Sequence, residues 1–119
     1  MKVLFAVGSD QISKNIADRY YEKYGEVLEY KTVFYFKNLV DAVREDKTYD
    51  IIVINEENME QYKAKDIDQI DSEIFHYVDT VTDEVQDSEI IFIGAERRTR
   101  GDKFILRLYH IGIYNILLG

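Results

Sequence analysis

The stretch Asp50-Ile51-Ile52-Val53-Ile54-Asn55 is an unbroken run of β-branched apolar residues between two polar ones. Similar apolar runs occur at residues 3–7 and 90–93. Runs that do not alternate with polar residues are typical of strands buried on both faces of a parallel sheet. Ligands and catalytic groups gather at the carboxyl ends of such strands. The residues that follow the three runs are Gly8-Ser9-Asp10, Asn55-Glu56-Glu57 and Gly94-Ala95-Glu96.

Helical patterns separate the strands. Ile12, Ile16, Tyr20 and Tyr24 recur every four residues and predict one apolar face of a helix at residues 10–24. Residues 56–68 are polar and weakly periodic, and we expect a mobile loop there. Five strands are predicted at residues 2–7, 28–36, 50–55, 89–95 and 113–118, with helices at 10–24, 38–46, 67–85 and after Asp102. This alternation predicts an α/β domain with three layers, α/β/α, around a parallel sheet.

Composition restricts the possible chemistry. The chain has 119 residues, which suit a single domain, and no cysteine, which excludes disulfides, thiolate catalysis and thiolate metal sites. No apolar run approaches the roughly 20 residues of a membrane-spanning helix. The short apolar stretch after Lys2 stops at Gly8 and is read as a strand, not as a signal peptide. We therefore expect a cytoplasmic protein that does not bind a membrane.

Charge is distributed unevenly along the chain. The net charge is −8, and residues 41–89 hold 16 of the 23 acidic residues. Residues 97–107 instead carry five basic residues and one acidic residue. An acidic domain binds nucleic acid poorly, because that affinity comes mainly from phosphate neutralisation. Two interpretations of the basic segment remain open, a docking surface for an acidic partner and an ordinary solvated loop.

Several stretches resemble the receiver domain of bacterial response regulators. Residues 50–55 resemble receiver strand 3, which reads Asp, four apolar residues and the phospho-accepting Asp; residues 112–117 resemble strand 5, and residues 90–95 resemble strand 4. The resemblance covers nearly the whole chain and implies a CheY-like, flavodoxin-like sheet of strand order 2-1-3-4-5. A receiver has a fifth helix after strand 5. Here we expect that last helix to be missing and the chain to be the N-terminal part of a longer protein.

The chemical positions of a receiver are replaced in this chain. The acceptor Asp is Asn55, the Mg²⁺-binding acid pair aligns with Gly8 and Ser9, and the Thr or Ser that contacts the phosphoryl group is Gly94. An amide is a poor nucleophile, and Mg²⁺ usually takes one or two carboxylates. The resemblance therefore indicates a degenerate pseudo-receiver that lacks aspartyl phosphorylation.

The strand ends still supply a candidate ligand site, made of Gly8, Ser9, Asp10, Asn55, Glu56 and Gly94. A helix start can bind an anion through its backbone N–H groups, but Ser and Asp are also favoured helix caps, and we prefer that role for Ser9 and Asp10. We expect no metal, no cofactor and no catalytic residue. The only histidines, His76 and His110, have no Ser or Cys partner suggested by spacing.

Three hypotheses follow. The first is a non-enzymatic regulatory domain of bacterial signal transduction that binds a protein partner, another domain of its own chain or a second copy in a homodimer. Its predicted interaction surface is Arg97, Arg98, Arg100, Lys103, Arg107, Tyr109 and Tyr114. The second is a domain that binds a nucleotide or another phosphate at the strand ends. The third and weakest is a small enzyme.

Overall fold

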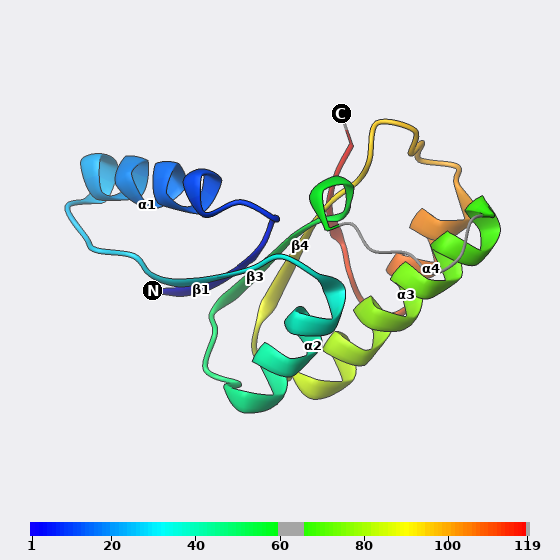
Figure 1. Cartoon of the computed structure of the whole chain (residues 1–119), viewed down its shortest axis with the longest axis horizontal. Helices are drawn as coiled ribbons and strands as arrows, with labels where there is room; N and C mark the ends of the chain where they lie inside the picture. The colour runs from blue at the N-terminus through cyan, green and yellow to red at the C-terminus, as the bar shows by residue number, and fades with distance from the viewer. Residues whose placement is uncertain (60–65, 119) are drawn as a thin grey trace.

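A five-stranded parallel sheet of order β2-β1-β3-β4-β5 forms the centre of the molecule (Figure 1). The computed structural model describes residues 1–59 and 66–118. The strands are β1 (Lys2–Ala6), β2 (Glu29–Val33), β3 (Ile51–Asn55), β4 (Glu89–Ile93) and β5 (Asn115–Leu117). This sheet confirms the fold class and the strand order expected from the sequence.

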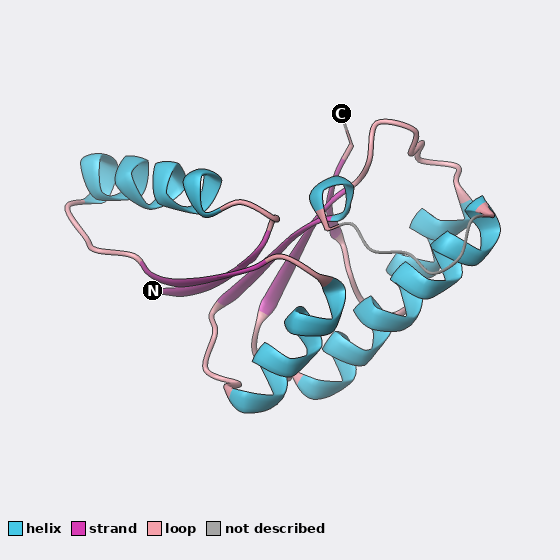
Figure 2. Ribbon diagram, viewed as in Figure 1, coloured by secondary structure: helices cyan, strands magenta, loops and turns pink. Residues whose placement is uncertain are grey.

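Four α-helices connect the strands in the described ranges: α1 (Asp10–Tyr24), α2 (Phe36–Glu45), α3 (Ile67–Glu84) and α4 (Lys103–His110), with a short 3₁₀ helix η1 (Glu56–Asn58) after β3. α2, α3 and α4 lie together on one face of the sheet, and α1 stands alone on the other (Figure 2). No helix among the described residues is long and apolar enough to cross a bilayer.

The hydrophobic core is correspondingly unequal on the two faces. Leu4, Ile52 and Phe92 point toward α2, α3 and α4 and are completely buried. Val3 and Phe5 point to the opposite face, where a much smaller cluster packs against α1. Alternate residues of each apolar run thus enter different layers, which explains why the runs do not alternate with polar residues.

The apolar face predicted for α1 is wrong in part, since Tyr20 packs against the smaller core cluster but the other three residues do not. Ile12, Ile16 and Tyr24 have exposed fractions of 38%, 42% and 59%. The buried side of α1 is centred on Ser13, whose Oγ accepts a hydrogen bond of 2.7 Å from the Thr32 hydroxyl on β2. A stripe of period four drifts around a helix of 3.6 residues per turn. The small side chain of Ser13 lets the helix lie close to the sheet, and the Ile residues remain on its flank.

Two other boundaries differ from the prediction. The predicted strand at residues 28–36 ends at Val33, and buried Phe36 begins α2 instead. β5 has three residues where residues 113–118 were predicted. The predicted loop at residues 56–68 contains η1 at its start and the first turn of α3 at its end. Its predicted mobility falls largely on residues 60–65, which lie outside the described residues.

Candidate functional site

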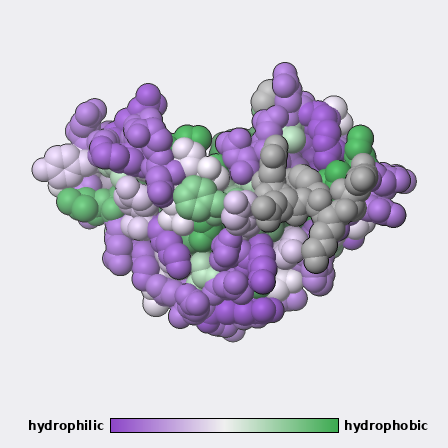
Figure 3. Space-filling view, viewed as in Figure 1, coloured by the Kyte–Doolittle hydropathy of each residue, from purple (hydrophilic) through white to green (hydrophobic). Residues whose placement is uncertain are grey.

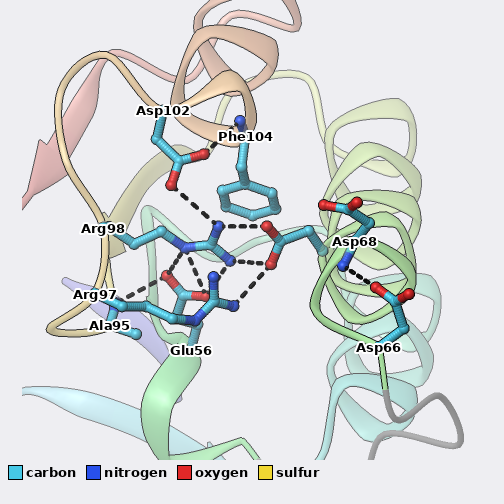
Figure 4. Close-up of polar contacts among 9 residues, drawn as sticks. Glu56, Asp66, Asp68, Ala95, Arg97, Arg98, Asp102 and Phe104 are labelled. Carbon is cyan, nitrogen blue, oxygen red and sulfur yellow. Dashed lines mark hydrogen bonds and ion pairs between the residues drawn. The ribbon is translucent and has the colours of Figure 1, made fainter.

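A buried guanidinium connects the ends of β3 and β4. Arg98 lies in the loop between β4 and α4, and its side chain has an exposed fraction of 0%. Its Nε donates to Oε2 of Glu56 at 2.9 Å and its Nη2 donates to Oε1 at 2.8 Å, which is a bidentate pair (Figure 4). Glu56, the first residue of η1, is itself only 1% exposed. Its Oε2 also accepts a hydrogen bond of 2.8 Å from the backbone N–H of Ala95.

Asp71 on α3 completes the cluster. It accepts 2.7 Å and 2.9 Å hydrogen bonds from Nη2 and Nη1 of Arg98, and a further 2.7 Å bond from Arg97. Asp102, the N-cap of α4, lies 3.6 Å from Nη1 of Arg98. The guanidinium also sits 3.8 Å from the ring centroid of Phe104. Four of the five N–H groups of Arg98 therefore donate to carboxylates, Nη1 also forms a longer ion pair with Asp102, and one face of the guanidinium is covered by an aromatic ring.

The electrostatics favour the charged forms of these groups. Burial acts to raise the pKa of the Asp71 carboxyl, but hydrogen bonds from Arg98 and Arg97 outweigh it, so the pKa lies below its ordinary value of 3.8. Burial alone would lower the pKa of Arg98, and the hydrogen bonds to Glu56 and Asp71 raise it instead. The cluster ties β3, β4, α3 and α4 into one unit. We call Glu56, Asp71, Arg97, Arg98 and Asp102 the ion cluster.

Acid should weaken the ion cluster through Asp71. Because the folded-state pKa of Asp71 lies below its ordinary value, the stability it gives is fully present above pH 3.8 and is lost as pH falls through the folded value. We expect the free energy of unfolding of Asp71→Asn to fall less steeply below about pH 4 than that of the wild type. Urea denaturation over a pH series measures both slopes. Equal slopes for the wild type and Asp71→Asn would contradict a lowered pKa of Asp71 in the folded state.

The residues predicted at the start of α1 have structural roles. Ser9 caps α1, and its Oγ accepts from the N–H of Ile12 at 3.3 Å. Asp10 is in the first turn of the helix, where a negative charge is favoured. Gly8 has a positive φ of 68°, and a Cβ built on it would lie 2.3 Å from the carbonyl oxygen of Asn58. The first strand end is therefore packed against η1.

The other candidate ligand residues are similarly engaged. Asn55 ends β3, and its Oδ1 caps η1 by accepting from the N–H of Glu57 at 3.2 Å. A Cβ on Gly94 would lie 2.8 Å from Cδ2 of Leu118 and 3.2 Å from Cγ of Arg98. A Thr or Ser at position 94 would therefore press first against the side chain of Leu118 and would also be in tight contact with Arg98. The side chains around Gly94 thus leave little room for a larger residue.

A hollow of about 560 Å³ lies beside this site, and its lining includes Glu56, Glu57, Glu96 and Arg97. Three of these four side chains are carboxylates, and the Arg97 guanidinium is paired with Asp71. Such a lining does not favour a phosphate. In residues 1–59 and 66–118, no three His, Cys, Asp or Glu side chains come together to hold a metal ion.

The predicted basic surface is divided by the structure. Arg98 is buried and cannot take part in a docking surface, because its charge is used within the ion cluster. Arg97, Arg100, Lys103 and Arg107 are exposed. Beside them, the rings of Tyr109 and Tyr114 stack with centroids 6.4 Å apart, and these residues are 39% and 72% exposed.

The sequence reasoning missed Asp71 and the role of Arg98. Asp71 precedes Ile74 and Val78 by three and seven residues, so it lies on the buried stripe of α3. A carboxylate on an apolar stripe is a signal that a buried partner exists, because an unpaired buried charge is strongly destabilising.

Comparisons with known proteins bear on this geometry. No protein-family model matches the sequence, and no curated protein matches it significantly. Among solved structures, a protein assigned as the pilus assembly protein CpaE2 of Sinorhizobium meliloti 1021 matches with a TM-score of 0.65, at 11% identity, over 99% of this chain and 87% of that one. The pilus assembly protein CpaE of Caulobacter crescentus CB15 matches with a TM-score of 0.63, at 7% identity, over 98% and 85%.

This chain has a receiver-like fold. A third similar structure, assigned as a pilus-assembly-related protein of Burkholderia pseudomallei K96243, has a TM-score of 0.54, 10% identity, and coverage of 99% of this chain and 77% of that one. At such low sequence identities, the similarity to these structures concerns the fold alone. The ion cluster is a property of this chain, established on its own residues.

Proposed function

We propose that this receiver-like chain is a non-catalytic regulatory domain that binds a protein partner without depending on phosphorylation. The observation that carries the proposal is the buried pair of Glu56 and Arg98. In a receiver, the phosphoryl group on the acceptor at the end of β3 contacts a residue at the end of β4. Here the Glu56 carboxylate makes that connection, through Arg98 and the backbone of Ala95. A carboxylate of the chain thus takes the place of an added phosphoryl group.

The permanent pairing of Glu56 with Arg98 would also affect the neighbouring surface. The β4–α4 loop and α4 carry the exposed bases Arg97, Arg100, Lys103 and Arg107, and the ion cluster fixes that loop from beneath. This surface would be presented to a partner in one conformation at all times. Its charge is opposite to that of the rest of the chain, which suits an acidic partner surface. The similar solved structures include pilus assembly proteins, which supports a role in a protein assembly.

The first test is chemical. We expect no phosphoryl transfer to this domain from acetyl phosphate with Mg²⁺, because Asn55 replaces the acceptor and Gly8 and Ser9 replace the acid pair. Intact-mass measurement after incubation checks this, with a phosphorylatable receiver treated in parallel. A stoichiometric gain of one phosphoryl group that hydroxylamine removes would refute the proposal.

The second test concerns the basic surface. Arg100→Glu with Lys103→Glu should weaken partner binding roughly tenfold at low salt, with a smaller effect at high salt, because exposed charges are screened beyond about 8 Å at 0.15 M. Both residues are exposed, and neither belongs to the ion cluster. Arg98 is left unchanged because it is buried. Sedimentation velocity measures self-association, and quantitative pull-down measures partner capture.

The matched control is Lys31→Glu with Lys37→Glu. It makes the same change of charge on β2 and α2, near the opposite edge of the sheet from β5. If both double variants reduce binding equally, the effect comes from net charge. If neither reduces it, the basic segment is only a solvated loop.

A further inference from the structure

The outer side of β2 is an unpaired edge of the sheet. β2 lies at one end of the strand order and pairs with β1 alone. Backbone hydrogen bonds of 3.1 Å and 3.4 Å join Glu29 and Val33 to residues beside the two ends of β1, so alternate residues from Glu29 to Val33 face inward. The backbone groups of Tyr30 and Thr32 therefore point away from the sheet. This is the arrangement to which a further strand can be added.

A groove runs along this edge, between β2 and α2. A hollow of about 400 Å³ is lined by residues 31–34 on one side and by Asn38, Asp41, Ala42 and Glu45 on the other. These four residues are three or four apart, so one flank of α2 faces the strand. Ala42 is buried and has the smallest side chain of the four, which leaves the middle of the groove open.

Apolar side chains are exposed along the same edge. Val27 and Phe34, which flank β2 in the chain, are 79% and 41% exposed. Tyr30 is 39% exposed on the α1 face of the strand, where its ring meets Phe5 edge-on with centroids 5.8 Å apart. Figure 3 shows hydrophobic atoms near the two ends of the path that β2 takes in Figure 1, on a surface that is otherwise mainly hydrophilic. An added strand would cover part of this surface with every second side chain.

The charge of the groove indicates what kind of strand fits. Asp41 and Glu45 are exposed, and neither forms an ion pair or side-chain hydrogen bond with another described residue. Glu29, on the same face of β2, has a side chain that is 74% exposed and lies 4.0 Å from Lys2. Lys31 is the one basic residue among those that line the hollow. The edge therefore favours a segment with basic side chains.

A second copy of this chain fits the edge less well. Joining two β2 edges would bring two acidic grooves together, in a domain whose net charge is −8. The antiparallel register that overlaps the whole of β2 would place Lys31 directly opposite Lys31 of the other copy, and like charges at that position are destabilising. Lysine on an edge strand is a common protection against such pairing.

We propose that the β2 edge binds an extended segment of a partner protein by strand addition. Alternate basic side chains of the segment would lie in the groove toward Asp41 and Glu45, and the apolar side chains between them would pack beside Tyr30. The backbone of the segment would bond to the outward groups of Tyr30 and Thr32. β2 is at the opposite edge of the sheet from β5, and the proposal depends neither on the absence of phosphorylation nor on the basic surface of α4.

A synthetic peptide tests the proposal. The probe is a fluorescein-labelled peptide of about seven residues in which Lys and Val alternate, because a strand of five residues spans about 16 Å. Fluorescence anisotropy should show saturable binding to the wild type. Asp41→Lys with Glu45→Lys should weaken it at least about tenfold. The matched control, Asp83→Lys with Asp87→Lys, makes the same change of charge at exposed residues near the end of α3 and should leave binding nearly unchanged.

Two further probes test strand addition itself. Each carries a single N-methyl group, at one of two adjacent central residues of the peptide, which removes one N–H donor. Alternate residues of a strand direct their backbone groups to opposite sides, so only one of these two peptides should bind at least about tenfold more weakly than the unmodified probe.

The proposal is overturned if the unmodified peptide does not bind, or if both N-methyl peptides bind alike. It is also overturned if the two double variants weaken binding equally, because the effect would then come from net charge. Sedimentation velocity tests the remaining occupant. A wild-type dimer that Tyr30→Pro dissociates would overturn the proposal, because proline removes an outward N–H of β2 and a second copy would then occupy the edge.

Discussion

Arg98→Met is expected to lower the free energy of unfolding by about 3–5 kcal/mol, which is a large part of the stability of a domain of this size. Methionine keeps most of the side-chain volume but donates no hydrogen bond. The buried Glu56 carboxylate would then lose its bidentate hydrogen bonds from Arg98 and keep the one from the N–H of Ala95 (Figure 4). Urea denaturation of the purified domain measures the change.

Two further variants test whether the loss of stability comes from the ion cluster. Arg100→Met removes an exposed arginine two residues away and should change stability by no more than about 0.5 kcal/mol. Glu56→Gln added to Arg98→Met should recover part of the loss, because it removes a buried charge that has lost its guanidinium partner. If Arg98→Met is no less stable than Arg100→Met, the ion cluster does not hold the site together.

Gly8→Ala is expected to cost about 3 kcal/mol or more. Two effects add at this position, because alanine pays roughly 1–2 kcal/mol for the left-handed conformation, and its Cβ would meet the Asn58 carbonyl oxygen at 2.3 Å. That oxygen belongs to the backbone, so either β1 or η1 must move. The same urea measurement gives the size of the effect.

Two other glycines separate these effects. Gly25, the C-cap of α1, has a similar φ of 66°, but a Cβ there would meet nothing within 4 Å. Gly25→Ala should therefore show the conformational cost alone. Gly101 has neither a positive φ nor a neighbour within 4 Å, so Gly101→Ala should be nearly neutral. Equal losses for Gly8→Ala and Gly25→Ala would mean that η1 adjusts freely around a methyl group.

Most of the fold could be predicted because its signals are local. The apolar run at residues 51–54 and the helical spacing between Ile67 and Val81 each need only neighbouring residues to be recognised. α1 was placed correctly at Asp10–Tyr24, but its buried side was not. There the partner of Ser13 is Thr32 on another strand, and a hydrogen bond between distant residues leaves no periodic signal.

The ion cluster was harder to predict from the sequence for the same reason. Glu56 and Arg98 are separated by 42 residues, and each alone resembles an ordinary charged loop residue. The sequence located both at strand ends, where the fold brings them together, but it did not indicate that they pair. Arg98 was consequently grouped with Arg97 and Arg100 as surface, although its side chain points inward.

The ion cluster also limits how this sequence can change over time. Arg98 is the common member of the cluster, because it contacts Glu56 after β3, Asp71 on α3 and Asp102 at the start of α4. A substitution at Asp71 leaves the bidentate pair of Arg98 and Glu56 in place, whereas a substitution at Arg98 reaches three segments of the chain at once. Position 98 is therefore the one in the cluster at which a change of sequence is least tolerable.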